Sequence, residues 1–110
     1  MRCSLFLLPT ALGFVALSIA ALGDDDARLK RLGQHLAQEC TGCHRLDGTD
    51  SGIAPINGWD VDRFIASIKF YQTGERSNPV MVSVAKSLDE EQVRALAAYY
   101  ATLPKPPAKK

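Results

Sequence analysis

The feature that most constrains this chain is a short cysteine motif, CTGCH, at residues 40–44. Two cysteines three positions apart, with a histidine directly after the second, suit four structures: a disulfide, a zinc site, a redox dithiol, or a point of covalent attachment. Each of these requires a different fold around it. The rest of the sequence therefore has to decide among them.

The first residues of the chain have the layout of an export signal. Arg2 precedes an uncharged apolar stretch from Leu5 to Leu22, and small residues follow, which predicts a signal peptide over residues 1–23 with cleavage after Gly23. An uncleaved membrane anchor is the alternative, because roughly 20 apolar residues span a bilayer. Pro9 and the small residues at the end of the stretch favour removal.

The remaining chain is balanced in charge and too small for a large core. Removing residues 1–23 takes away Arg2 alone, so the 13 Lys and Arg fall to 12, against 12 Asp and Glu. That balance favours neither nucleic acid nor an anionic membrane surface as a partner. A disulfide between Cys40 and Cys43 would close a loop too short to stabilise the fold appreciably. A domain of this size often depends on a metal or a large cofactor.

Hydrophobic periodicity predicts a single all-α domain over residues 24–103, with helices near residues 25–39 and 60–74 and a last one ended by Pro104. Asp60 is the expected N-cap and Gly74 the expected end of the second helix. Ser87 and Glu90 predict a capping box for the last helix. The segments 40–59 and 75–87 read as loops, and residues 104–110 as a disordered Pro and Lys tail.

Covalent haem attachment accounts for the motif better than the other chemistries. Structural zinc usually takes two separated pairs of ligands, and a redox dithiol follows a strand, whereas no second pair and no strand are predicted. Cys-x-x-Cys-His instead suits two thioether bonds to haem, with the histidine as an iron ligand. We therefore predict one haem c, attached through Cys40 and Cys43, with His44 bound to the iron.

The second axial position of that iron decides between electron transfer and chemistry at the metal. Met81 is the one methionine besides Met1. We predict Met81 as the second iron ligand, because its thioether would raise the reduction potential and close the iron to small molecules. The alternative for Met81 is a flexible core residue. An open iron position would instead indicate a gas sensor or a peroxidase.

Three stretches of the chain together resemble the small bacterial class I cytochromes c: CTGCH, APINGW and TGERSNPVMVSVAKSLDEEQVRALAAYY. The last stretch is similar to the haem subunit of flavocytochrome c sulfide dehydrogenase. The resemblance covers essentially all of the chain after the predicted signal. It implies the class I cytochrome c fold, with about three main helices and loops wrapped around one covalent haem.

The resemblance also implies roles for two residues outside the motif. It implies that the Pro55 carbonyl accepts a hydrogen bond from the second ring nitrogen of His44, with an ordinary turn proline as the alternative. Gly33 matches a small residue where the first helix crosses the last one, and we expect it to face Tyr99 or Tyr100.

Three further side chains have open roles. Trp59 is a candidate to contact a haem propionate, with packing at a helix entry as the alternative. Lys69 and Arg76 are candidates to neutralise propionates or to face a partner, with plain solvation as the alternative.

Together these features predict a periplasmic electron-transfer protein with redox proteins as partners. No catalytic residues are predicted, because no nucleophile is paired with a base, so activity by the chain alone is not expected. The alternative is the haem subunit of an enzyme complex in which a flavoprotein oxidises sulfide.

Overall fold

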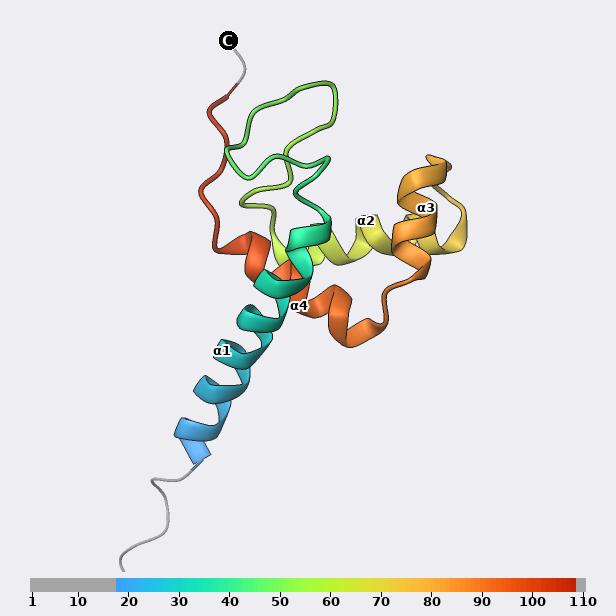
Figure 1. The fold of residues 1–110 in the computed structure, drawn as a ribbon. Coiled ribbons are helices and arrows are strands. Elements are labelled where there is room, and N and C mark those ends of the chain that lie inside the picture. Colours follow the sequence, from blue (N-terminus) through green and yellow to red (C-terminus); the bar gives the residue numbers. More distant parts are fainter. Residues whose placement is uncertain (1–17, 109–110) are drawn as a thin grey trace, which may run out of the picture.

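The computed structural model describes residues 18–108 as helices joined by loops (Figure 1). The elements in chain order are α1 (Ser18–Leu36), the 3-10 helix η1 (Ala37–Glu39), α2 (Val61–Thr73), α3 (Pro79–Lys86) and α4 (Glu90–Ala101). Within these residues there is no strand. The all-α prediction is confirmed, with four α-helices where about three were expected.

Helix α1 is longer than the periodicity predicts. It begins at Ser18 instead of near residue 25, and Figure 1 shows its first turns extending away from the other helices. The predicted signal peptide lies largely outside the described residues, so its cleavage stays a prediction. Among residues 18–108, no helix combines the length and the apolar character that crossing a bilayer requires.

The crossing of α1 and α4 depends on Gly33. A Cβ atom at this position would overlap the carbonyl oxygen of Ala95 and lie 2.8 Å from the Cβ atom of Tyr99. A glycine costs about 1 kcal/mol in a helix interior, so its presence here is explained by this close approach. The expected contact between Gly33 and an aromatic residue of the last helix is confirmed, with Tyr99 in that place.

The core lies where α4 packs between α1 and α2, and α3 adds one buried residue. The Phe64 and Tyr100 rings stack with their centroids 5.5 Å apart. Aromatic pairs at this distance stabilise a core beyond the area that they bury. The buried residues of this core cluster are Ala37, Phe64, Ile68, Ala85, Val93, Leu96, Ala97 and Tyr100.

The bounds of α2 agree with the sequence signals. Asp60 is its N-cap residue, although the Asp60 side chain makes no capping hydrogen bond. Gly74 follows the last turn with a φ of 82°, in the left-handed region where glycine is favoured. The backbone therefore leaves the helix at Gly74, and residues 75–78 connect it to α3.

The prediction of an irregular segment over residues 75–87 is wrong. Residues 79–86 form α3, because Asn78 caps the helix and accepts a hydrogen bond from the Met81 N–H at 3.1 Å. Pro79 occupies the first helical position, where a missing N–H removes no hydrogen bond from the helix. Met81 therefore lies in the first turn of a helix.

The predicted capping box of the last helix is also misplaced, by two residues. Asp89 is the N-cap of α4, and the reciprocal hydrogen bonds of the box join Asp89 and Gln92. The Ser87 hydroxyl instead donates to the Val84 carbonyl at 2.6 Å. Ser87 thus ends α3 and is not free to begin α4.

The end of the chain packs where a disordered tail was predicted. Lys105 lies so close to Gly58 that a Cβ atom there would be 2.6 Å from the Lys105 Cγ atom. Pro106 is half-buried beside Gly48. Figure 1 shows this final segment running alongside the loop between η1 and α2. Residues 109–110 lie outside the described part.

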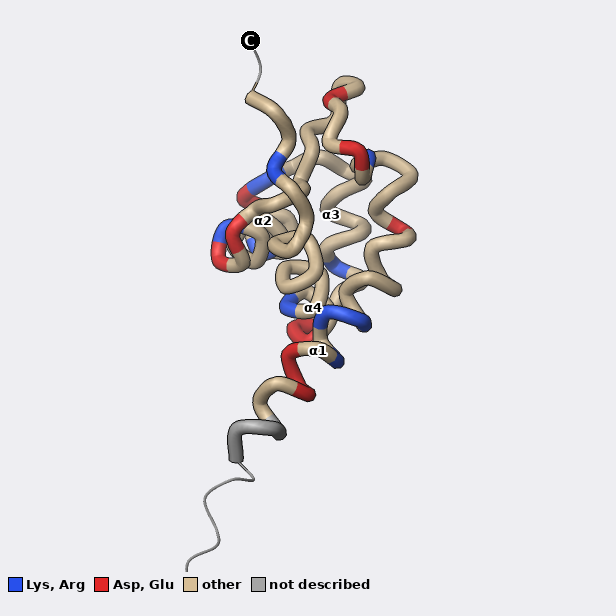
Figure 2. Tube along the Cα trace, turned by 90° about the vertical axis from the view of Figure 1, so that its left-hand side faces the viewer, with Lys and Arg blue, Asp and Glu red and all other residues tan. Residues whose placement is uncertain are grey.

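Acidic and basic residues occupy successive turns of α1. Figure 2 shows an acidic turn at residues 24–26 followed by basic residues at 28–31. Lys30 pairs with Asp26 at 2.6 Å within the helix, and Arg28 reaches Glu91 of α4 at 2.9 Å. All four side chains are largely exposed, so these ion pairs contribute little to stability.

Candidate haem-attachment site

The cysteine motif forms a tight turn at the end of η1. Cys40 follows the 3-10 helix, and its carbonyl oxygen accepts from the Cys43 N–H at 3.2 Å and from the His44 N–H at 2.8 Å. The two cysteines form no disulfide with each other, and Cys40 is half-buried whereas Cys43 is exposed. The turn therefore holds two thiols and one imidazole together on a short stretch of backbone.

His44 is oriented by a backbone carbonyl in the following loop. Its Nδ1 atom donates to the Ala54 carbonyl oxygen at 2.8 Å. This acceptor lies one residue before Pro55, whose carbonyl the family resemblance had implied. A residue before proline is restricted to extended backbone, so Pro55 restrains the peptide that aims the Ala54 oxygen. The bond leaves Nε2 of His44 available to a metal.

The Cys40 thiol is held in its neutral form by its surroundings. Burial raises the pKa of Cys40, the nearby Tyr100 hydroxyl opposes this to a smaller extent, and Glu39 adds to the rise. Burial and the neighbouring Cys40 raise the pKa of Tyr100 in turn. The Tyr100 hydroxyl is fully buried and makes no hydrogen bond of regular geometry. Cys40 and Tyr100 are thus both uncharged at neutral pH.

Met81 lies in the first turn of α3, far along the chain from the motif. It is half-buried and packs against the core cluster, as Cys40 also does. Around it, Val80 and Val84 on the same helix are 63% and 38% exposed. Apolar side chains left this open beside a thioether form a surface suited to a large apolar group.

The loop after the motif is organised by its own side chains. The Asp47 carboxylate accepts from the Thr49 hydroxyl at 2.7 Å and from the Thr49 N–H at 2.9 Å, and these bonds lower its pKa. Arg45 pairs with Asp47 at 3.1 Å. The buried Asn57 amide donates to the Leu46 carbonyl, which ties the beginning of the loop to its end.

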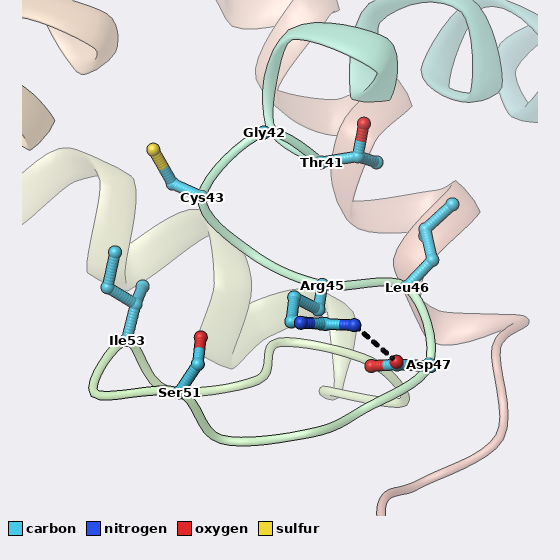
Figure 3. Close-up of a pocket in the computed structure, with 8 residues that line it drawn as sticks. All are labelled: Thr41, Gly42, Cys43, Arg45, Leu46, Asp47, Ser51 and Ile53. Atoms are coloured by element: carbon cyan, nitrogen blue, oxygen red, sulfur yellow. Dashed lines mark hydrogen bonds and ion pairs between the residues drawn. The ribbon is translucent and has the colours of Figure 1, made fainter.

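A cavity of about 560 Å³ opens beside the motif, inside this loop. Figure 3 shows Cys43 and Ile53 on one side of it and the Arg45–Asp47 ion pair on the other. Ile53 is 42% exposed, which adds an apolar side chain next to the Cys43 thiol. The lining residues are Thr41, Gly42, Cys43, Arg45, Leu46, Asp47, Ser51 and Ile53.

Comparison with known proteins matches residues 31–104 to the family described as Cytochrome c. This range contains the whole motif, the loop, the last third of α1 and all later helices. The chain belongs to the cytochrome c family. This cytochrome therefore carries electrons on a haem c that is bound covalently through Cys40 and Cys43.

Three relatives of this cytochrome illustrate the range of similar proteins. The cytochrome subunit of sulfide dehydrogenase from Chlorobaculum tepidum is 29% identical, over 90% of this chain and 91% of that protein. Cytochrome c-554(548) from Halomonas halodenitrificans is 34% identical over 57% of this chain and 82% of its own length. A thiosulfate dehydrogenase electron acceptor from Stutzerimonas stutzeri is 30% identical, over 64% of this chain and 34% of its own.

The side chains of the site fit a haem group. The donor set consists of two cysteine sulfurs at the spacing that thioether bonds to haem require, the His44 imidazole with Nδ1 bonded to a carbonyl, and the Met81 thioether on α3. Among the described residues, no group of three or more His, Cys, Asp and Glu is placed to hold a metal ion without a porphyrin. The exposed apolar side chains of Ile53, Val80 and Val84 suit the faces and edges of such a ring.

The three side chains with open roles lie on or next to α2. The Arg63 guanidinium covers the Trp59 ring at 3.9 Å from its centroid, an arrangement that favours packing at the entry of α2. The Arg76 guanidinium lies 5.4 Å from the centroid of Tyr71. Lys69 is exposed on α2.

Sequence reasoning missed three residues that hold the site together. Asn78 carries a signal that could have revealed it, because Asn-Pro before an apolar run is a typical helix start. Ala54 acts through its backbone carbonyl, which leaves no trace in the side-chain pattern. Tyr100 was considered only as a partner of Gly33, and its position beside Cys40 depends on tertiary packing.

Proposed function

We propose that this cytochrome is a periplasmic one-electron carrier whose iron is bound axially by His44 and Met81. The observation that carries the proposal is the 2.8 Å hydrogen bond from His44 Nδ1 to the Ala54 carbonyl oxygen. His44 lies in the same turn as both cysteines, and Ala54 lies in the loop that follows. That bond fixes the imidazole and commits Nε2 to the metal. The bound haem supplies reversible one-electron chemistry at its iron.

Met81 defines the second axial ligand in this proposal. It is the only methionine among residues 18–108, and it borders the same core cluster as Cys40. A neutral, soft thioether favours ferrous iron and leaves no open position for a substrate. The protein would then transfer electrons without transforming a substrate at the metal.

Pro55 acts in this proposal as the residue that keeps Ala54 extended. Its ring restricts the preceding backbone and so aims the carbonyl at His44. We assign it a positioning role next to the haem and no direct bond to it.

The proposed periplasmic location rests on the beginning of the chain. Residues 1–23 have the layout of a cleaved export signal, and bacterial haem c attachment is completed outside the cytoplasm. No membrane association is proposed for the chain after cleavage.

A second candidate function is that of a dedicated haem subunit in an enzyme that oxidises inorganic sulfur. The similarity to a cytochrome subunit of sulfide dehydrogenase favours it, because the two chains match over nearly their whole lengths. In that case a flavoprotein would donate electrons through a lasting interface. A stable complex of this kind buries a large apolar area, whereas a free carrier uses a small and mostly polar patch.

Export of the full chain in a bacterium that matures cytochromes c tests the proposal. We expect a red protein whose intact mass equals residues 24–110 plus one haem, with a methionine-to-iron absorption band in the ferric state. A colourless chain with two free thiols would contradict haem attachment. A coloured protein without that band would contradict Met81 as the ligand. Purification from the source organism separates the two functions, since a co-eluting flavoprotein supports the subunit and a lone cytochrome supports the carrier.

A further inference from the structure

We propose that Gln72 on α2 is a positioning residue for Met81. Its side-chain amide fastens the end of α3 and so keeps the methionine sulfur at the iron. This inference rests on the axial role of Met81 proposed above, and it assigns a second residue to that ligand.

The Gln72 amide bridges two carbonyls at the point where α3 ends. Its Nε2 atom donates to the Ala85 carbonyl oxygen at 2.9 Å and to the Leu88 carbonyl oxygen at 3.2 Å. Ala85 belongs to the last turn of α3, and Leu88 lies in the link to α4. The Ala85 carbonyl oxygen also accepts from the Leu88 N–H at 3.2 Å, so the Gln72 amide is an additional donor at this helix end and comes from another helix. One side chain of α2 thus ties both segments to α2.

Helix α3 is short and only partly buried, so a polar tie to α2 matters for its position. It has eight residues, and isolated helices of this length are unstable in water. Ala85 is its one fully buried residue, while Val80 and Val84 remain exposed. The Gln72 amide adds a polar tie to α2 to the apolar contacts that Ala85 and the half-buried Met81 make with the core.

Met81 is coupled to the Gln72 contact through a single turn of helix. Ala85 lies four residues after Met81, so the two residues are stacked along one face of α3. At the other end, Asn78 accepts from the Met81 N–H at 3.1 Å. The ligand is thus held between a cap before it and the Gln72 amide after it. Releasing the amide would let α3 move and would weaken the bond from sulfur to iron.

The holoprotein with Gln72→Leu tests this assignment, and Gln34→Leu serves as the matched control. Gln34 is an exposed residue of α1, so the same change there removes no contact with α3. The measurement is titration of the ferric protein with imidazole, which competes with methionine for the iron. Loss of one or two hydrogen bonds predicts about tenfold tighter imidazole binding in Gln72→Leu, a weaker methionine-to-iron band, and a lower reduction potential. Gln34→Leu should match the wild type.

Two more variants keep the test decisive. Gln72→Glu keeps the size but places an acceptor against two carbonyls, and it should also bind imidazole more tightly. Gln72→Lys restores a hydrogen-bond donor, and its positive charge is favourable near the C-terminus of a helix. We therefore expect its imidazole affinity and its reduction potential to return toward those of the wild type. Imidazole affinities of the Leu and Glu variants within twofold of the wild type, even with lower thermal stability, would overturn the assignment. A wild-type protein without the methionine-to-iron band would instead refute the proposed ligation.

Discussion

The hydrogen bond between His44 and Ala54 shows how one contact can define a metal ligand. With Nδ1 donating to a carbonyl oxygen at 2.8 Å, the imidazole keeps a single orientation and a single free nitrogen. The oxygen also makes the ring a stronger electron donor to a metal at Nε2. The orientation of His44 as a metal ligand therefore depends on the Ala54 carbonyl oxygen, whose direction Pro55 restrains.

Replacing Met81 tests the other axial position. Met81→Ala removes the thioether, so we expect the methionine-to-iron band to disappear and the reduction potential to fall by on the order of 0.1 V. Carbon monoxide should then bind the ferrous protein readily. The measurements are a redox titration and an optical titration with carbon monoxide.

Ser83→Ala is the control for that experiment, because it changes an exposed side chain of the same helix that has no part in the haem site. It should leave both properties unchanged. An unaltered spectrum in Met81→Ala would mean that the iron has another ligand or an open position.

At the scale of elements, α1 and α4 cross in close contact at Gly33. These helices approach so closely at Gly33 that a methyl group has no room beside the Ala95 carbonyl. The motif begins directly beyond this crossing, because η1 continues α1. The crossing thus sets where Cys40 lies relative to Tyr100.

Gly33→Ala should therefore destabilise the protein although alanine favours helix. The steric cost of overpacking is about 1–3 kcal/mol and exceeds the roughly 1 kcal/mol gained in helix propensity. Chemical denaturation of the holoprotein measures the net loss. Gln34→Ala, at the exposed position next to it, should be neutral or slightly stabilising. Equal stability of the Gly33→Ala protein and the wild type would show that α1 can shift without cost.

At the scale of the whole molecule, the sequence predicted most of what local chemistry determines. The haem motif and the all-α class follow from residues close together in the chain. Position 79 misled the prediction because proline interrupts a helix in its interior but suits its first turn. Three contacts join segments that are separated in the chain: the hydrogen bond from His44 to Ala54, the contact of Tyr100 with Cys40, and the packing of Pro106. No local pattern encodes those contacts.

The packing of the last residues can be tested by truncation. Deleting residues 105–110 removes the contacts of Lys105 and Pro106 with the loop glycines, and we expect a loss of about 1 kcal/mol in unfolding free energy. Pro107→Ala changes an exposed residue of the same segment, serves as the control and should have no effect. Denaturant titration of the three proteins distinguishes these results, and equal midpoints would mean that the segment contributes nothing.

The small core predicts dependence of the whole fold on its haem. A Cys40→Ala, Cys43→Ala double variant should be colourless and should melt at least about 10 °C lower, or without a cooperative transition. Circular dichroism during heating measures this. Cys43→Ala alone retains one thioether and should keep haem and most of the stability. A double variant that melts sharply at the wild-type temperature would show that the polypeptide folds unaided.

The pairing of α1 with α4 has a consequence for the order of events during biosynthesis. The first helix packs on the last one, so that contact cannot form until nearly all of the chain has been made. Until then Cys40 and Cys43 lie on a segment without its supporting framework. Both thiols therefore stay accessible to a modifying enzyme until α4 packs on α1, and burial of Cys40 comes as one of the final steps.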